Sequence, residues 1–550
     1  MIKLGISAFY HDSAACIIKG NQVLVAAEEE RFTGIKHDSS FPIQAISWCF
    51  KQTKFKIEDI DIVYWYEDPI VKHDRVTKIF DKRWFKTFFL RRKYNKQRKE
   101  NDPAKLLMDL GYRGKIHYIP HHQSHAKFAY FTSPFKESAI LTIDGVGEWE
   151  TVTVSRAVGN EINKIKTIEF PNSLGMLYST ITAYLGFKPN EGEYKVMGLA
   201  PYGNPKNRFR DKLDKLFSKR TTNKFWLDQK YFTWEYSDKI MFNKNLCRLL
   251  DLEPRLPEEP IRQDHKDLAY ALQSLYNREF SKLVVLAKNI TASNNLCLSG
   301  GCAYNGVANN LAYSKFKSIH IPFSPSDAGS AIGACLTSHI KLNPYLGPEY
   351  KNEDITKLLY DEDIRKKVRF INDSYANIVT KVAQKLHDNK VVAWFQGKME
   401  FGARALGNRS ILANPLDPNM RDKLNRVIKK REGFRPFAPS VIEEKAKDYF
   451  NINEPIPYMN QVVQAKTDYF PSATHVDGTS RVQTVTRQQN PRYYQLLKEF
   501  EKISGHPVLL NTSFNLKDQT ITRTPRQAIE RFVHSDIDYL VINNIVILKN

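Results

Sequence analysis

Hydrophobic residues in the first part of the chain follow an order that occurs twice. Short apolar runs at 4–7, 15–18 and 23–25, separated by polar residues and a Gly-Asn turn, predict a strand, a loop and a hairpin. The same order of apolar run, polar loop and hairpin recurs over residues 139–160. Two copies of one such unit predict two similar lobes whose polar loops face a shared cleft.

A long helical period of apolar residues follows at roughly 264–288. It leads into a strand at 295–298, a glycine turn at Gly300-Gly301, a strand at 318–321 and a helix that opens at Ala328. This alternation of strands and helices predicts an α/β fold. A glycine turn between a strand and a helix also lets backbone amides approach a phosphate or a ribose.

The apolar pattern breaks near residue 343, in a stretch rich in proline and glycine that predicts a linker. We therefore expect one domain over residues 1–345, a linker over 346–355 and a second domain over 356–550. The elements predicted for the second domain are a helix around 375–389, strands at 390–396 and 506–510, a helix capped by Thr524-Pro525 and a terminal hairpin at Asn543-Asn544.

The composition is that of a globular protein, with 42% hydrophobic and 26% charged residues in a chain of 550. The chain contains no apolar run of about 18 residues, so we expect no membrane-spanning helix. Its start, Met1–Ser7, is predicted to be a strand and not a signal peptide. Six cysteines without a Cys-x-x-Cys pair argue against a disulfide framework or a cysteine zinc site and favour the cytoplasm.

The net charge of +22 is concentrated in one segment, residues 72–99, which holds twelve Lys or Arg and two acids. Phe80, Trp84 and Phe88 recur there at helical spacing, with Phe85 and Phe89 beside them. One interpretation is a helix that packs its aromatic stripe and solvates its basic face. The others are a site for an anionic acceptor, a contact with a membrane surface, or a nucleic-acid patch.

Two histidines and two aspartates form a candidate metal site. His121 and His125 are four positions apart, so on a helix both rings leave the same face. Asp144 and Asp327 each stand at the end of a strand or loop with a glycine within the next two positions. Histidine pairs at this spacing also occur by chance, but with the aspartates the set suits Zn²⁺, Fe²⁺ or Mn²⁺. His122 points away and is assigned a structural role.

Two loops in the first domain carry further candidate residues. Residues 190–203 combine several glycines with Lys195, as a loop near a nucleotide would, although a plain surface turn explains them almost as well. His11-Asp12 lies in the first predicted loop. A histidine beside a carboxylate can act as a general base on a hydroxyl, but such a pair is also a common polar turn.

The second domain has a concentration of arginine and lysine among apolar residues and glycines. Arginine in partly apolar surroundings needs an anion, and its guanidinium matches a phosphate. Residues 511–515 follow a strand and supply neutral donors. The alternative is a structural network of arginines with carboxylates. The residues of this candidate anion site are Arg404, Arg409, Lys429, Arg431, Arg435, Asn511 and Ser513.

At these residues the chain resembles the carbamoyltransferases of natural-product and nodulation-factor biosynthesis, the group of the tobramycin, cephem and nodulation-protein-U enzymes. The similarity runs from the first strand to the C-terminus. The most specific matching segments are His11–Ala15, Ala27–Phe32, His121–Ala126, Glu193–Gly203, Phe401–Ser410, Arg435–Pro439 and Asn511–Asn515.

This resemblance implies an N-terminal two-lobed, actin-like (ribonuclease-H-like) domain and a C-terminal YrdC-like α/β domain. It also implies that carbamoyl phosphate and ATP, with Mg²⁺, give a carbamoyl-adenylate in the C-terminal domain. The carbamoyl group then passes to an acceptor hydroxyl in the N-terminal domain.

Carried onto this sequence, the resemblance assigns a role to each candidate. The metal, typically iron, is held by His121, His125, Asp144 and Asp327. The adenosine lies near Gly300, Gly301 and Asn305, with Lys195 and Gly198 close by. His11 is the hydroxyl base beside Asp12. Carbamoyl phosphate and the ATP phosphates are held by Lys429, Arg404, Arg431, Asn511 and Ser513, with Arg409 and Arg435 in the same basic region.

Two other functions stay open at this point: a tRNA threonylcarbamoylation enzyme built from the same domain types, and a non-catalytic ATP-binding module. The expected acceptor is a sugar hydroxyl of a glycan, a glycolipid or an aminoglycoside-like metabolite. The basic aromatic segment 72–99 favours an anionic acceptor or a peripheral membrane contact. Nucleic acid is not expected as a partner, and a homodimer is left open.

Overall fold

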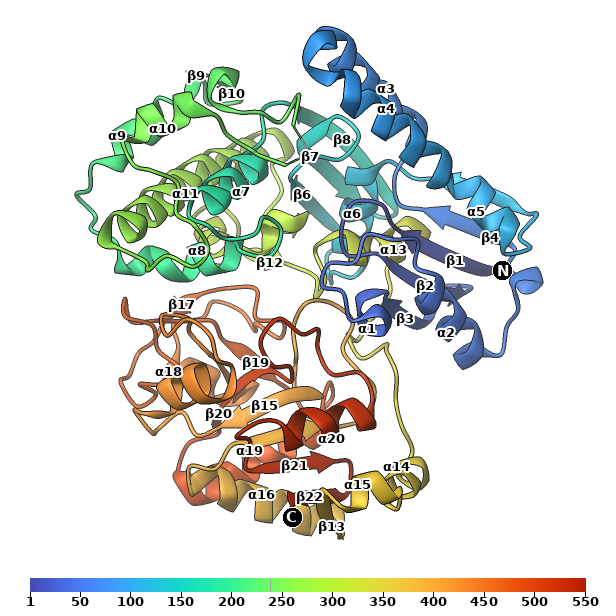
Figure 1. Ribbon diagram of the computed structural model, residues 1–550, viewed down its shortest axis with the longest axis vertical. Coiled ribbons are helices and arrows are strands. Elements are labelled where there is room, and N and C mark those ends of the chain that lie inside the picture. Colours follow the sequence, from blue (N-terminus) through green and yellow to red (C-terminus); the bar gives the residue numbers. More distant parts are fainter. Residues whose placement is uncertain (238) are drawn as a thin grey trace. The chain divides into compact units, whose positions relative to one another are not determined.

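The computed structural model describes residues 1–237 and 239–550, apart from the side chains of Trp84 and Phe85. The chain is mixed α/β and divides into two compact units (Figure 1). The N-terminal unit consists of residues 1–29 and 37–342, and the C-terminal unit of residues 30–36 and 343–550. The predicted linker 346–355 therefore lies in the C-terminal unit, where Leu346 is buried and α14 (Asn352–Leu359) begins.

The N-terminal unit contains two five-stranded sheets of the same design. The first has the order β3-β2-β1-β4-β5 and the second the order β8-β7-β6-β11-β12. In each sheet the first strand of the repeat pairs antiparallel with a hairpin and parallel with a later strand, which confirms the repeat predicted from the sequence. The strands are β1 (Ile2–Ser7), β2 (Ala14–Lys19), β3 (Gln22–Glu28), β4 (Ile62–Trp65), β5 (Lys115–Tyr118), β6 (Glu137–Ile143), β7 (Glu150–Val158), β8 (Glu161–Glu169), β11 (Asn295–Ser299) and β12 (Ser318–His320).

Two helices join the sheets by crossing over from one to the other. α6 (His121–Phe131) follows β5 in sequence but packs on β6 and β11, and α13 (Asp327–Cys335) follows β12 but packs on β1 and β2. The two helices also pack against each other (Figure 1). Their backbones approach closely because Gly333 has no side chain. A Cβ there would lie 2.2 Å from the carbonyl oxygen of Ser124.

The remaining elements of the N-terminal unit surround these sheets. The long predicted helix at 264–288 lies within α11 (Gln263–Thr291) and is confirmed. The other helices are α2 (Ile43–Thr53), α3 (Pro69–Lys82), α4 (Trp84–Glu100), α5 (Pro103–Asp109), α7 (Leu174–Tyr184), α8 (Glu193–Leu199), α9 (Phe209–Asp214), α10 (Lys244–Leu250) and α12 (Gly306–Asn309), and a hairpin is formed by β9 (Phe217–Arg220) and β10 (Phe225–Leu227).

The basic segment 72–99 forms two helices and not one. Arg83, between α3 and α4, is non-helical and binds the buried carboxylate of Glu235 through Nε at 3.0 Å and Nη2 at 2.7 Å. Phe80 is buried, but Phe88 and Phe89 are 56% and 83% exposed, so the predicted aromatic stripe is only partly packed. Its other members, Trp84 and Phe85, have side chains outside the described part of the structure. None of the described helices is long and apolar enough to cross a membrane.

The C-terminal unit is built on an eight-stranded sheet with helices on both faces. Alternate residues of β14 divide between two cores: Val392 and Trp394 pack against α16 and α19, whereas Ala393 and Phe395 join the core on the other face. The sheet order is β13-β22-β21-β14-β15-β20-β16-β19. Its strands are β13 (Val368–Asn372), β14 (Val392–Phe395), β15 (Arg409–Ala413), β16 (Ala438–Ile442), β19 (Gln483–Val485), β20 (Val508–Ser513), β21 (Tyr539–Ile542) and β22 (Ile545–Lys549).

The elements predicted for this unit are confirmed. The sequence placed a helix around 375–389, and Thr524 caps α20 as expected, accepting from the amide of Gln527 at 3.1 Å. The hairpin β21–β22 turns at Asn543-Asn544. The helices are α1 (Glu30–Thr33), α14, α15 (Glu362–Arg365), α16 (Tyr375–His387), α17 (Met420–Asp422), α18 (Ala446–Tyr449), α19 (Pro491–Ser504) and α20 (Pro525–Val533), and β17 (Val463–Gln464) pairs with β18 (Thr479–Ser480).

Replacing Gly333 with alanine tests the contact between α6 and α13. The added Cβ meets a backbone oxygen that cannot rotate away, so we expect the N-terminal unit to lose about 1–3 kcal/mol in its free energy of unfolding, followed by urea denaturation. Gly433→Ala is the control, because a Cβ at Gly433 has no neighbour within 4 Å. Equal stability of the two variants would contradict the tight crossing.

Candidate active site

The first turn of α6 is fixed by a carboxylate that the sequence analysis did not single out. Glu148 is buried and accepts from the backbone amide of His121 at 2.9 and 3.0 Å, and from that of Asp68 at 2.7 Å. A carboxylate at a helix N-terminus satisfies donors that have no partner within the helix. Glu148 therefore sets the position of the helix that carries the two histidines.

The four predicted metal ligands come together in one buried cluster in the N-terminal unit. The Nε2 atoms of His121 and His125 are 3.1 Å apart, and they lie 3.0 and 3.2 Å from Oδ2 of Asp144. Oδ1 of Asp327 is 3.6 Å from Nε2 of His121 and 3.3 Å from that of His125. One ligand atom from each residue lies within 4.8 Å of all the others. We call these four residues the metal cluster.

The chemistry of the metal cluster fits a cation. All four residues are at most 3% exposed, and Oδ2 of Asp327 has no hydrogen-bonding partner among the described residues. Burying two carboxylates without a compensating charge is costly, so they demand either protons on the histidines or a metal. Burial would lower the pKa of His121, but the charge of Asp327 and the contact with Asp144 outweigh it and raise the pKa to about 9. Two nitrogens and two carboxylates suit Zn²⁺, Fe²⁺ or Mn²⁺ alike.

The neighbouring His122 is buried but faces elsewhere. Its Nδ1 lies 3.1 Å from Oγ1 of Thr153 on β7. Burial and the positive charge of His121 hold its pKa well below the usual value. The structure thus separates the neutral His122 from the two cluster histidines, as the helical spacing predicts.

The loop with His11 and Asp12 lies close to the metal cluster. Asp12 binds two histidines: its Oδ2 is 3.1 Å from Nδ1 of His11, and its Oδ1 is 2.6 Å from Nδ1 of His37. Burial lowers the pKa of His11, but the charges of Asp327 and Asp12 raise it more, to about 10. His37 could not be predicted from the sequence, because it lies 25 residues from Asp12 with no motif around it.

The predicted nucleotide residues of the N-terminal unit fall into two groups. Gly300 and Gly301 lie at the metal cluster: the amide of Gly301 is 3.3 Å from Oδ1 of Asp144, and Gly300 has a φ of +87°. A Cβ on Gly300 would lie 2.2 Å from the carbonyl oxygen of Ile143. Asn305 caps α12 and exchanges amide hydrogen bonds with Gln273 at 3.1 and 3.2 Å. These contacts give Asn305 a structural role that does not involve a nucleotide.

Lys195 and Gly198 belong to α8, and Gly198 is buried near the end of this helix. The ammonium of Lys195 lies 5.5 Å from the centre of the Phe187 ring. Both residues contribute to the packing of this helix, which contacts α11. The loop predicted at 190–203 is thus largely helical.

The C-terminal unit gathers the predicted cations around the end of β20. Lys429 is 3% exposed and follows a π-helix at Lys423–Ile428, a distortion that is frequent at functional sites. Its ammonium donates to the carbonyl oxygens of Ser513 and Asn515, at 2.5 and 2.8 Å, and to Oδ1 of Asn515 at 2.8 Å. Burial, with the charges of Arg431 and Arg435, holds the pKa of Lys429 well below its usual value. An anion bound nearby would raise it.

One buried amide organises the loop that follows Lys429. Oδ1 of Asn425 accepts from Nε of Arg431 at 2.7 Å, and its Nδ2 donates to the carbonyl oxygen of Arg435 at 2.9 Å. The guanidinium of Arg431 lies 4.7 Å from the centre of the Phe437 ring. Asn425 was missed in the sequence because a single asparagine within a helical pattern gives no signal.

Arg409 is held in a way that differs from its expected role. It is fully buried, and its two terminal nitrogens donate to the carbonyl oxygens of Gln396 at 2.6 Å, Pro348 at 2.8 Å and Gly397 at 3.0 Å. It also stacks 3.6 Å from the centre of the Phe395 ring. The structure gives Arg409 backbone partners and thus a part in folding, so it is left out of the proposed anion site.

The loop 401–408, which carries Arg404, is fixed from several directions. Oε1 of the buried Glu400 accepts from the amides of Leu406 at 2.7 Å and Asn408 at 2.8 Å. Nδ2 of Asn511 donates to the carbonyl oxygen of Ala405 at 3.2 Å. Asn511 therefore supports the backbone next to Arg404. Ser513 donates to Oδ1 of Asn515 at 2.7 Å.

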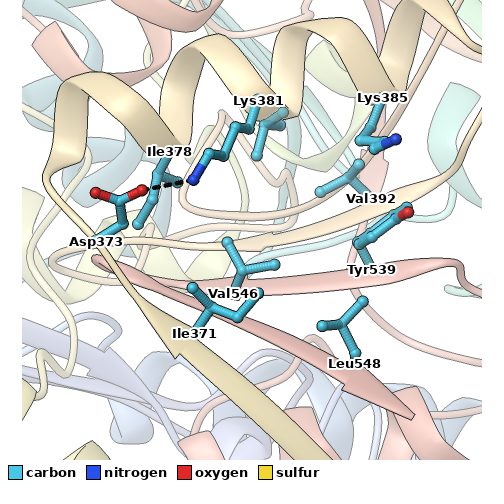
Figure 2. Close-up of a pocket in the computed structure, with 10 residues that line it drawn as sticks. Ile371, Asp373, Ile378, Lys381, Lys385, Val392, Tyr539, Val546 and Leu548 are labelled. Carbon is cyan, nitrogen blue, oxygen red and sulfur yellow. Dashed lines mark hydrogen bonds and ion pairs between the residues drawn. The ribbon is translucent and has the colours of Figure 1, made fainter.

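A separate pocket of about 170 Å³ opens between α16 and the sheet of the C-terminal unit (Figure 2). Lys381 and Asp373 pair at 2.7 Å on its wall, and the rest of the lining is mainly apolar. None of its lining residues belongs to the predicted site. The candidate functional residues therefore remain those of the metal cluster and of the cation group around the end of β20.

Comparison with known proteins identifies close relatives. Two family models match: carbamoyltransferase N-terminus over residues 2–336 and carbamoyltransferase C-terminus over 383–549. An uncharacterized protein of Synechocystis sp. is 39% identical, over 99% of this chain and 96% of its own. Nodulation protein NolNO of Sinorhizobium fredii is 33% identical, over 99% of this chain and 80% of its own, and NolO of Bradyrhizobium diazoefficiens is 35% identical, over 78% of each. Among solved structures, an activator of 2-hydroxyisocaproyl-CoA dehydratase from Clostridium difficile, 14% identical, covers 61% of this chain and 92% of its own with a TM-score of 0.32.

Adjacent histidines provide a matched test of the metal cluster. We expect His121→Gln to lower the affinity for Fe²⁺, Zn²⁺ or Mn²⁺ at least about 100-fold, because one of four ligands is lost. His122→Gln removes a buried histidine one position away and should leave the affinity unchanged. Calorimetric titration of metal-free protein measures both. Equal losses in the two variants would show that the effect is structural.

Metal binding should also release protons. The raised pKa of about 9 means that His121 is protonated at neutral pH without metal, and a ligand must be deprotonated. The apparent affinity should therefore rise with pH, about tenfold per unit for each proton released, and level off above pH 9. Calorimetry in buffers of different ionisation enthalpy counts the protons. An affinity that does not change between pH 6 and 9 would contradict this coupling.

Proposed function

Because the chain belongs to the carbamoyltransferase family, we propose that it is an ATP-dependent O-carbamoyltransferase with carbamoyl phosphate as the donor. The observation that carries the proposal is the buried metal cluster of the N-terminal unit together with the His11–Asp12 loop, which lies near enough for the charges of Asp327 and Asp144 to act on His11. A cation site beside a histidine that can accept a proton is suited to moving an acyl group onto a hydroxyl.

The first step is assigned to the C-terminal unit, for which we propose a YrdC-like function. Carbamoyl phosphate, ATP and one water give carbamoyl-adenylate, pyrophosphate and phosphate. The reactants carry many negative charges, which Lys429, Arg431, Arg435 and Arg404 would balance. To bind a phosphate, Lys429 must exchange one of its carbonyl partners for the ligand. Asn425 and Asn511 hold the two loops that carry the arginines.

The second step is assigned to the N-terminal unit, for which we propose an actin-like architecture. The acceptor hydroxyl attacks the carbamoyl carbon of the adenylate, AMP leaves, and the hydroxyl proton passes to His11. Asp12 holds the ring of His11 through Nδ1, which leaves Nε2 to accept this proton. A divalent cation on the metal cluster, with iron as our choice, would supply positive charge for the departing phosphate. The turn at Gly300-Gly301 would lie beside the nucleotide at this point.

The pKa of His11 links the base to the metal cluster. At about 10 in the metal-free protein, this pKa makes His11 a cation at neutral pH and unable to accept a proton. Asp327 is the charge that raises it most. A cation held by Asp327 offsets that charge and lowers the pKa of His11 towards neutral pH. The base would thus become active only when the metal cluster is loaded.

The acceptor is proposed to be a sugar hydroxyl on a small molecule, glycan or glycolipid. Relatives of the chain are named nodulation proteins. The exposed Phe88 and Phe89 of α4 lie among lysines and arginines, which favours an anionic acceptor or an anionic membrane surface that presents it. Mg²⁺ is proposed to accompany ATP in the C-terminal unit.

Two variants should separate the two steps. Lys429→Met is expected to lower carbamoyl-phosphate-dependent pyrophosphate release about 100-fold or more, because a cation at the phosphates is lost. His11→Asn should leave that release unchanged and slow carbamoyl transfer about 10²- to 10⁴-fold, because the base is lost. The transfer assay uses radiolabelled carbamoyl phosphate, ATP and a glycan extract, with mass spectrometry to locate the added carbamoyl group.

Assays of the wild-type protein test the proposed function directly. Absence of carbamoyl-phosphate-dependent pyrophosphate release would overturn it. If label appears on adenosine of added tRNA in the presence of threonine, the protein is a tRNA-modifying enzyme. If His11→Asn lowers both steps equally, the division of labour is wrong.

A further inference from the structure

A short N-terminal segment is part of the C-terminal unit. After β3 the chain leaves the N-terminal unit at Glu29, packs with the C-terminal unit over residues 30–36, and returns at His37. Both ends are tied to the loop that carries His11 and Asp12. The amide of Glu29 donates to the carbonyl oxygen of Ser13, and the amide of Ser13 donates to that of Asp38, both at 2.8 Å.

Arg31 attaches this segment to the loop of Arg404. The side chain of Arg31 is 4% exposed, and its Nη2 donates to the carbonyl oxygen of Gly402 at 2.8 Å. In turn, Nε of Arg523 donates to the carbonyl oxygen of Arg31 at 2.9 Å. The guanidinium of Arg523 lies 4.6 Å from the centre of the Phe32 ring. The segment is therefore held on both its backbone and its side chains.

The backbone on both sides of Arg404 is thereby fixed. Arg31 binds the carbonyl group two positions before it, and Asn511 binds that of Ala405 just after it. Gly402 has a φ of +107°, which glycine adopts readily, and because glycine is the most flexible residue, a contact to its carbonyl group helps to keep the turn in one conformation. Loss of the Arg31 contact would loosen the side of the turn that precedes Arg404, while Glu400 and Asn511 still hold the side that follows it.

The segment also brings positive charge to the same region. Lys36 is near enough to Lys429 to help lower its pKa, as Arg31 is to Arg531. Two acids pair with cations of this group: Glu30 pairs with Arg31, and Glu432 lies 3.4 Å from Arg435. A concentration of positive charge in one region attracts an anionic ligand.

We propose that residues 30–36 complete the anion site of the C-terminal unit, with Arg31 as the positioning residue for Arg404. The ligand class is a polyphosphate or an acyl phosphate. This inference rests on the proposed function for the identity of the reaction, but the binding of an anion does not depend on it. The C-terminal unit alone, without the N-terminal segment, lacks a working site.

The test uses the full-length protein and pyrophosphate as the probe. Arg31→Met is expected to raise the dissociation constant for pyrophosphate about 10- to 100-fold, and the KM for carbamoyl phosphate by a similar factor with a smaller change in kcat. Arg31→Lys, which can still donate to the carbonyl of Gly402, should recover part of the loss.

Arg255→Met is the matched control. Arg255 is also buried and donates to backbone carbonyls, among them that of Leu185 at 2.6 Å, but it lies in the N-terminal unit. It should lower thermal stability without changing pyrophosphate binding. If Arg31→Met only lowers stability and binds pyrophosphate as the wild type does, the proposal is overturned.

The outcomes separate this inference from the proposed function. Wild-type protein that binds pyrophosphate but shows no carbamoyl-phosphate-dependent turnover would remove the proposed function, and loss of binding in Arg31→Met would still support the anion site. Wild-type protein that binds no pyrophosphate would overturn the inference.

Discussion

The close crossing of α6 and α13 is the constraint on which the N-terminal unit depends. Each helix follows the last strand of one sheet and packs on the other sheet, so their contact joins the two halves of the repeat. Gly333 allows the backbones to meet at the carbonyl group of Ser124. The same crossing brings the first turn of α6, with its two histidines, to the first residue of α13, which is Asp327. The packing of α6 on α13 therefore also brings the ligands of the metal cluster together.

The candidate sites of the two units carry opposite charge: carboxylates in the N-terminal unit and cations in the C-terminal unit. In the N-terminal unit, two buried carboxylates raise the pKa values of His11 and His121 and call for a cation. In the C-terminal unit, burial and then the charges of Arg431 and Arg435 lower the pKa of Lys429, which a bound anion would offset. Each unit thus holds a charged cluster that suits a ligand of the opposite charge. The proposed function includes both ligands: a divalent cation for the N-terminal unit and phosphates for the C-terminal unit.

The role of a buried arginine in this protein depends on the groups that its guanidinium binds. Arg409 looks like a phosphate ligand in the sequence, next to glycines and an asparagine, but backbone carbonyls occupy both its terminal nitrogens. Arg31 lies 371 positions away in the sequence from the glycine that it binds. Neither fact could be read from local composition, because both depend on which carbonyl groups the fold leaves without partners.

The sequence by itself determined the elements and the family. Alternation and turn residues predicted the repeated strand units, the 3.6-residue period predicted α11, and spacing put His121 and His125 on one helix face apart from His122. These features are local, so short-range rules suffice. Only the tertiary structure decided that Asp12 binds His37, that Glu148 holds α6, that Arg83 splits the basic segment into two helices, and that residues 30–36 join the C-terminal unit. Those contacts join residues far apart in sequence, and burial and complementary charge select them only once the chain is folded.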